Sequence, residues 1–289
     1  MEITRKAYAK INLGLDVTGK RDDGYHLVRM IMQNVDLYDT LTYRLNDSGD
    51  ISLSASAEGV PTDDSNLICK VAHQLQKEYG VSKGADITLE KRIPVAAGMA
   101  GGSTDGAATY LALNELWGLG LSKEQLCKLA VKLGADIPYC IVGGTALSEG
   151  IGEVLTPIKE MPKCHLVIAK PAIAVSTGWV YTELDSKEIP SHPDIDGIRG
   201  AIEDGNLKRM CDLIGNVLED VTTSRYSVIK DIEKILEDNG AVRAFMTGSG
   251  PTVFAVYDDK EKAKEGYRAV EKSGLAPELF LSEPIDPNK

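Results

Sequence analysis

Cysteine and histidine are scarce in this chain, and neither residue is clustered. The five cysteines, at positions 69, 127, 140, 164 and 211, include no Cys-x-x-Cys pair, and the four histidines are scattered. A zinc site needs closer groupings of these residues, so none is expected. We predict that all five thiols are reduced and mostly buried, because free cysteine usually behaves as a small apolar residue.

Long apolar runs and an excess of positive charge are also absent. No run approaches the ~18 residues of a membrane helix, and the first residues lead into a strand pattern without a signal-peptide core. We therefore expect a cytoplasmic protein with no membrane partner. The net charge is −11, whereas nucleic-acid-binding surfaces carry a basic stripe, so no nucleic-acid partner is expected. A phosphorylated ligand must find positive charge locally, and the candidates are Lys10, Lys91, Arg92 and helix N-termini.

A glycine-rich segment at residues 94–108 organises the rest of the chain. It follows a strand-like run at 85–91 and opens a helical pattern, which gives the order strand, loop, helix. Glycines let a backbone approach a ligand closely, and the first turn of a helix presents unpaired N–H groups, so this order suits phosphate binding. The residues concerned are Gly98, Gly101 and Gly102, followed by Ser103 and Thr104, whose hydroxyls could cap the helix, contact a phosphate or bind a magnesium ion carried by a nucleotide.

The best-known loops of this kind do not fit the spelling. A Walker loop needs a lysine after Gly102, a dinucleotide fingerprint needs Gly-x-Gly-x-x-Gly, and a hydrolase elbow needs Gly-x-Ser-x-Gly; none is present. A capped structural turn remains an alternative. The spelling from Pro94 to Thr104 resembles the phosphate loop of the GHMP kinases, Pro-x-x-x-Gly-x-Gly/Ala-Gly-Gly-Ser-Ser/Thr, with Ala100 as the one softened position.

The N-terminal segment carries a second match. Residues 3–18 alternate as strands, with apolar residues on one parity and Lys10 and Asn12 on the other, so a solvated lysine is the plain alternative for Lys10. A turn at Asp23-Gly24 precedes Tyr25 and His26. Together, Ala-Lys-x-Asn-Leu and Arg-x-Asp-Gly-Tyr-His resemble the signature of the GHMP subfamily that acts on 4-diphosphocytidyl-2-C-methyl-D-erythritol.

Two further segments complete the resemblance. Gly134-Ala135-Asp136-Ile137-Pro138 reads as a helix-to-strand junction before the apolar run 139–147, where Asp136 could simply be a turn or capping residue. In the resembled kinases this segment carries the catalytic carboxylate. The loop at 247–252, Thr-Gly-Ser-Gly-Pro-Thr, is similar to the third GHMP motif, which folds against the phosphate loop.

The remaining pattern predicts an α+β protein of two domains, 1–157 and 158–289. A helix should start near Asn66, and a capping box at Ser122 should start another that ends at Gly134. In the second half we expect a strand at 164–170, a short helix from Ser176, a loop at 189–196, helices at 206–221 and 225–239, strands at 242–246 and 253–257, a helix at 260–273 and a last strand near 278–281.

The resemblance implies a fold and a set of roles. The fold would be that of the GHMP kinases, with an N-terminal domain like domain 2 of ribosomal protein S5 and a ferredoxin-like C-terminal domain. Asp136 would be the general base, with Lys10 near it as a compensating charge. The implied ATP-binding residues are Asn66, Lys91, Pro94, Ala97, Gly98, Met99, Ala100, Gly101, Gly102, Ser103 and Thr104, although Asn66 could instead only cap its helix. The implied substrate-binding residues are Asn12, Tyr25, His26, Tyr181 and Gly248.

The implied reaction is phosphorylation of the 2-hydroxyl of 4-diphosphocytidyl-2-C-methyl-D-erythritol in the non-mevalonate isoprenoid pathway. ATP and Mg²⁺ would be required, and the protein would be a monomer or a homodimer. Two alternatives stay open: another GHMP kinase, for homoserine or a mevalonate derivative, and a non-catalytic binding protein with the same fold. The first should lack Asp-Gly-Tyr-His, and the second should have lost Lys10, Asp136 or the glycine loop.

Overall fold

The computed structural model describes residues 1–187, 189 and 191–289, and the chain forms two compact units. Unit 1 comprises Met1–Ala9, Leu37–Val95 and Ala100–Val142, and unit 2 comprises Lys10–Asp36, Ala96–Met99 and Gly143–Lys289. The units are discontinuous because two long strands, β1 (Glu2–Lys20) and β2 (His26–Asn46), contribute residues to both. The expected domain boundary at residue 157 divides the chain into two continuous segments, unlike these discontinuous units, and it stays a prediction.

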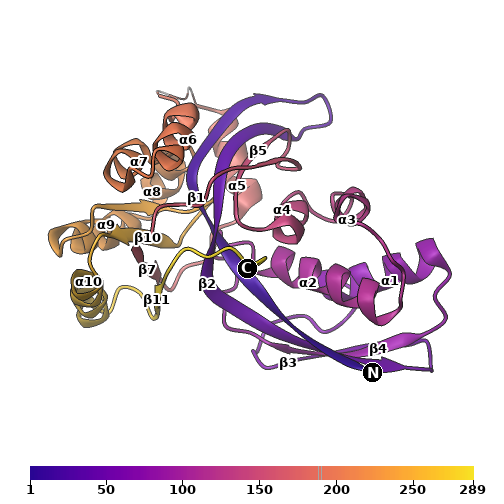
Figure 1. Ribbon diagram of the computed structural model, residues 1–289. Coiled ribbons are helices and arrows are strands. Elements are labelled where there is room, and N and C mark those ends of the chain that lie inside the picture. The colour runs from indigo at the N-terminus through magenta and orange to yellow at the C-terminus, as the bar shows by residue number, and fades with distance from the viewer. Residues whose placement is uncertain (188, 190) are drawn as a thin grey trace. The chain divides into compact units, whose positions relative to one another are not determined.

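In unit 1, a small sheet is covered by helices. Strand β4 (Gly84–Glu90) pairs in parallel with β3 (Ile51–Ala55) and antiparallel with the end of β2. Helices α1 (Leu67–Tyr79), α2 (Gly101–Leu116), α3 (Lys123–Ala130) and α4 (Ile137–Val142) gather on one side of it (Figure 1). Their apolar faces and the sheet share one core, which includes Leu41, Tyr43, Ile68, Leu75, Tyr110 and Leu113.

Local sequence signals set two of the four helix starts in unit 1. The Asn66 side chain accepts the Ile68 N–H at 2.9 Å at the start of α1. Ser122 and Gln125 form the predicted capping box at the start of α3. Helix α3 ends at Ala130, four residues before the predicted end at Gly134, because the chain continues there as turns rather than as helix. The helix starts are therefore confirmed, and the end of α3 is corrected.

Unit 2 is built on a second sheet, in the order β11 (Glu278–Ser282), β7 (His165–Lys170), β10 (Val253–Tyr257) and β9 (Arg243–Met246), with every pair antiparallel. Helices α9 (Val228–Asp238) and α10 (Lys260–Ser273) pack against it, and the Tyr257 hydroxyl donates to the Leu236 carbonyl of α9. Strand β5 pairs with both β2 and β6, and β8 pairs with β1. The elements of this unit are β5 (Thr145–Glu149), β6 (Val154–Pro157), β7 (His165–Lys170), α5 (Thr177–Asp185), α6 (Ile195–Glu203), α7 (Leu207–Leu213), β8 (Gly215–Asn216), α8 (Glu219–Arg225), α9 (Val228–Asp238), β9 (Arg243–Met246), β10 (Val253–Tyr257), α10 (Lys260–Ser273) and β11 (Glu278–Ser282).

The predicted strands and helix after residue 242 are confirmed, whereas the predicted helix at 206–221 is wrong. That segment forms α7, the short strand β8 and α8, because Gly215 and Asn216 pair with Gly14 and Leu15 of β1. Pairing with a distant strand overrides the local helical pattern. The predicted loop at 189–196 includes position 190, which lies outside the described residues, and its end already belongs to α6, a helix that the sequence pattern did not indicate.

Burial along β1 is partly as predicted. The alternating apolar residues are buried, among them Ala9, Ile11 and Leu13 at 0% exposure. The opposite parity is buried as well, since Lys10 is 4% and Asn12 2% exposed. The alternative reading of Lys10 as a solvated strand lysine is therefore wrong.

Candidate active site

The glycine loop ends in a helix N-terminus that lacks a side-chain cap. Helix α2 begins at Gly101, and its N-cap residue Ala100 lies in the left-handed region with φ 58°. Ala100 stands where the motif admits either glycine or alanine, and it adopts a conformation that glycine usually takes. The first turn contains no acidic residue, and its leading N–H groups have no intrahelical acceptors. This end of α2 can accept an anion such as a phosphate.

The two hydroxyls at the start of α2 have different surroundings. Thr104 is buried, and its Oγ1 donates to the Tyr8 carbonyl at 2.9 Å. Ser103 is half-buried and has no hydrogen-bond partner for its hydroxyl among the described residues. Of the two predicted contacts to a nucleotide-bound metal, Ser103 therefore has the hydroxyl available.

Lys91 lies in a buried cluster of unit 1, beside the start of α2. Its Nζ donates to Asp105 Oδ2 at 2.9 Å and to Asp39 Oδ2, and its side chain is 7% exposed. Asp39 Oδ1 also accepts the backbone N–H groups of Arg92 and Ile93. A Cβ on Gly101 would lie 3.0 Å from Lys91 Nζ, so glycine at this position lets α2 begin beside the cluster. In this structure the predicted ATP-binding lysine is paired with two carboxylates.

Burial and charge perturb the titration of this cluster. Burial raises the pKa of Asp105 to about 7; Lys91 opposes that rise, and the nearby Asp39 adds to it. Burial alone would lower the pKa of Lys91, but the two carboxylates outweigh it and the net shift is upward. Asp105 Oδ1 is buried without a hydrogen-bond partner in the described structure. The lysine is therefore held in its charged form, while one carboxylate titrates near neutrality.

Three other predicted residues of unit 1 occupy defined positions. Asn66 caps α1 and also donates through Nδ2 to the Pro61 carbonyl at 2.7 Å. Pro94 is buried at the start of the loop. Asp136 is half-buried directly before α4, and its carbonyl accepts the Cys140 N–H at 3.1 Å. The predicted helix-to-strand junction is wrong here, because the apolar run first forms a helix, and periodicity does not distinguish a short buried helix from a strand.

Lys10 belongs to unit 2, where its ammonium donates to two neutral oxygens among the described residues. Nζ donates to Asn12 Oδ1 at 2.7 Å and to the Gly98 carbonyl at 3.0 Å. The Lys10 backbone N–H donates to the Met99 carbonyl at 3.2 Å, so this strand residue is joined to the glycine loop twice. A buried cation without a carboxylate partner among the described residues of its unit favours an anionic ligand beside it.

The loop at 247–250 packs against residues 96–99 of the glycine loop, as the third motif predicted. A Cβ on Gly98 would lie 2.5 Å from the Thr247 carbonyl oxygen, and one on Gly248 would lie 2.7 Å from the Gly98 carbonyl oxygen. Both positions also have positive φ, so both the lack of space and the backbone conformation favour glycine there. Asn216, which the sequence analysis missed, donates to the Met246 and Gly248 carbonyls at 3.1 and 2.8 Å. The interruption of the helical pattern at Gly215-Asn216 was the available signal.

His26 lies in a polar and aromatic cluster of unit 2. Its Nε2 lies 2.6 Å from Asp185 Oδ1, and Lys20 Nζ lies 2.5 Å from the other oxygen of that carboxylate. The Tyr181 ring covers the imidazole, with ring centroids 4.6 Å apart and an angle of 31° between the planes. Tyr25 is 57% exposed. Asp185 was not among the predicted site residues, because it stands 159 residues from His26 in the sequence.

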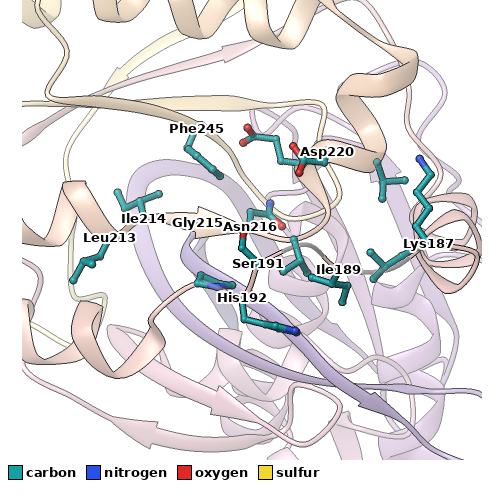
Figure 2. A pocket seen from close by; sticks show the side chains of 15 residues that line it. Lys187, Ile189, Ser191, His192, Leu213, Ile214, Gly215, Asn216, Asp220 and Phe245 are labelled. Atoms are coloured by element: carbon teal, nitrogen blue, oxygen red, sulfur yellow. The ribbon is translucent and has the colours of Figure 1, made fainter.

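Unit 2 also contains a pocket of about 470 Å³ that includes none of the predicted site residues. Leu213, Ile214 and Phe245 line it together with polar residues such as His192 and Asn216 (Figure 2). Among the described residues, no group of three or more His, Cys, Asp or Glu could hold a metal ion. Nor does any helix in the described ranges have the length and apolar character needed to cross a membrane.

Comparison with known proteins identifies the class first. Residues 66–144 match the GHMP kinases N terminal domain, and residues 198–275 match the GHMP kinases C terminal domain. A crystal structure of homoserine kinase from Cytophaga hutchinsonii covers 99% of this chain, with 95% of its own length aligned, a TM-score of 0.80 and 19% identity, and shows the same fold. The match to both GHMP kinase domains identifies the chain as an ATP-dependent small-molecule kinase.

The nearer relatives narrow the family. A 4-diphosphocytidyl-2-C-methyl-D-erythritol kinase from Lachnoclostridium phytofermentans is 48% identical over 97% of this chain and 96% of the relative. One from Clostridium perfringens is 44% identical over 98% of both chains. A crystal structure of 4-(cytidine 5'-diphospho)-2C-methyl-D-erythritol kinase has a TM-score of 0.82 and 28% identity, covering 98% of this chain and 99% of the other. The chain belongs to this family of GHMP kinases.

Proposed function

We propose that this kinase transfers the γ-phosphoryl group of ATP to the 2-hydroxyl of 4-diphosphocytidyl-2-C-methyl-D-erythritol. The observation that carries the proposal is Lys10, a buried ammonium held by Asn12 and by the Gly98 carbonyl of the glycine loop. The names of the full-length relatives and the matched segment from Arg21 to His26 support this substrate.

The phosphate-binding role falls to the glycine loop and the start of α2. The transition state of phosphoryl transfer is largely dissociative, so the protein mainly positions the groups and neutralises their charge. The N–H groups at the start of α2 would bind phosphate oxygens, and Lys10 would add positive charge. Lys91 would hold the start of α2 in place through its ion pairs with Asp105 and Asp39. Asn66 and Pro94 would lie beside the nucleotide.

The acceptor hydroxyl needs a base and an orienting group. We assign the base to Asp136, which would take the proton of the 2-hydroxyl as it attacks. We assign binding of the diphosphocytidyl part to Asn12, Tyr25, His26, Tyr181 and Gly248. Stacking on an exposed ring such as Tyr25 and hydrogen bonds to the edge of the base would hold the cytosine.

Mg²⁺ fits the residues at the start of α2. The Ser103 hydroxyl has no partner within the described structure, and a hydroxyl at this position is a suitable oxygen ligand. When bound, the ion would neutralise charge on the transferred phosphate groups. We propose that it enters with ATP rather than occupying a site built from protein carboxylates.

The test is an ADP-release assay with ATP, Mg²⁺ and one acceptor at a time: the cytidyl substrate, homoserine or mevalonate. We expect turnover with the cytidyl substrate alone and a loss of ~100-fold or more in Asp136→Asn, the scale of a lost general base. Asp238→Asn, an exposed aspartate on α9, is the matched control and should retain activity. Turnover with homoserine or mevalonate instead would reassign the substrate. ATP binding without turnover on any acceptor would indicate a non-catalytic protein.

A further inference from the structure

The stability of helix α5 does not explain why an aspartate occupies position 185. Asp185 is the last residue of α5, and a carboxylate at a helix C-terminus meets the negative end of the helix dipole. Its side chain is 35% exposed, so packing does not require it either. The carboxylate instead bridges two residues from the hairpin that joins β1 to β2. Oδ1 lies 2.6 Å from His26 Nε2, and Oδ2 lies 2.5 Å from Lys20 Nζ.

The hairpin holds its side of this bridge in place. Lys20 is the last residue of β1 and His26 the first of β2. Between them the Arg21 N–H donates to the Tyr25 carbonyl at 2.8 Å, and Gly24 turns the chain with φ 90°. The His26 side chain is only 12% exposed, and the Tyr181 ring covers it. The imidazole therefore has little freedom to rotate.

The bridge selects one form of the imidazole. Hydrogen bonds from His26 and Lys20 hold the pKa of Asp185 below its usual value, so this carboxylate is ionised at neutral pH and can only accept. The proton of this hydrogen bond must then reside on Nε2 of His26. In the neutral ring Nδ1 carries a lone pair, and it has no hydrogen-bond partner among the described residues.

We propose that Asp185 is a positioning residue that sets the pyrimidine specificity of the enzyme: it fixes the proton of His26 on Nε2, so that Nδ1 accepts a hydrogen bond from the amino group of cytosine. This inference rests on the proposed function and deepens it. Cytosine presents an amino donor at ring position 4, where uracil presents a carbonyl acceptor. A lone pair on Nδ1 therefore attracts the first base and repels the second.

The first experiment reads the tautomer in the free enzyme, independently of catalysis. The chain has only four histidines, so the ring signals in ¹H–¹⁵N spectra of labelled protein can be assigned with His26→Gln. At about pH 8, where an unperturbed imidazole is neutral, we expect His26 to carry its proton on Nε2. His192 provides an internal contrast, because its Nδ1 lies 2.7 Å from Asp16 Oδ1 and should carry the proton instead.

The variant Asp185→Ala should release the His26 tautomer and weaken the discrimination together. We expect its His26 signal to shift toward a mixture of tautomers. We also expect the ratio of kcat/KM for the cytidyl substrate over its uridyl counterpart to fall by ~10-fold or more, through KM rather than kcat. Asp196→Asn is the matched control, since it breaks another exposed aspartate ion pair of unit 2, with Arg29, and should change neither measurement.

The outcomes separate this inference from the proposed function. An unchanged specificity ratio in Asp185→Ala, or a His26 that keeps its Nε2 proton there, would overturn the role of Asp185. A wild-type His26 protonated on Nδ1 would overturn it as well. A wild-type enzyme that shows the expected tautomer but phosphorylates neither nucleotide substrate would instead remove the proposed function.

Discussion

Each unit contains a lysine paired with two buried carboxylates, and the two clusters differ in whether the lysine itself is buried. In unit 1, Lys91 is 7% exposed, and its partners Asp39 and Asp105 are 0% and 5% exposed. In unit 2, Lys230 is 48% exposed, while Glu219 and Glu233 are 3% and 9% exposed. The first cluster encloses its cation completely, whereas the second leaves its cation half in water.

The comparison shows that one lysine does not satisfy two buried acids. In each cluster one carboxylate oxygen, on Asp105 or Glu233, is buried without a partner in the described structure. Burial raises the pKa of Glu233 to about 8, with Glu219 adding to the rise, much as burial raises that of Asp105 to about 7. Each cluster also reaches a loop of the proposed site. Asp39 accepts N–H groups before the glycine loop, and Glu219 accepts the Met246 N–H before the loop at 247–250.

The largest expected effect comes from removing the enclosed cation. Lys91→Met leaves two buried carboxylates without a counter-charge, and we expect the free energy of unfolding to fall by ~3–5 kcal/mol. Lys230→Met should cost less than half as much, because water reaches that lysine and can solvate the exposed edge of the cluster. Urea unfolding of both variants at pH 7 measures the difference. Equal losses would show that burial of the cation is not what separates the clusters.

The next effect depends on pH and should follow from neutralising Glu233. Its pKa is about 8 in the folded protein and about 4.5 when unperturbed. The folded state therefore keeps a proton that the unfolded chain releases, and stability falls as the pH rises from about 4.5 to about 8. Glu233→Gln is neutral throughout, so it should gain up to ~4 kcal/mol on the wild type between pH 5 and pH 8.5, because about three pH units between the two pKa values fall in that interval. Thermal unfolding at both pH values tests this, and a gain independent of pH would contradict the assignment.

The smallest effect is expected where both partners are exposed. Lys234 and Asp238 form a pair on α9 with side chains 75% and 59% exposed. Lys234→Ala should change the free energy of unfolding by less than ~0.5 kcal/mol, and high salt should diminish that change further. A loss comparable to that of Lys230→Met, measured by the same urea titration, would mean that exposure does not grade these ion pairs.

Local signals in the sequence determined much of the secondary structure. Asn66 and Ser122 act as helix caps through atoms two or three residues away, and the helix at 260–273 has a cap and an apolar stripe of its own. The glycine loop was recognisable because its backbone conformation restricts which residues fit. Such features can be predicted because the cause lies within a turn or two of the residue concerned.

Contacts over long sequence separations were decided by the tertiary structure. Asp39 pairs with Lys91, Asp185 with His26, and β8 with β1 only after the strands have set which segments meet. The burial of Lys10 has the same origin, since a strand pattern reports alternation but not whether both faces are covered. The sequence by itself thus determined the caps, the loop and the family motifs. The tertiary structure alone decided which charged side chains are buried and which carboxylates pair with which basic side chains, because both depend on packing between residues far apart in the chain.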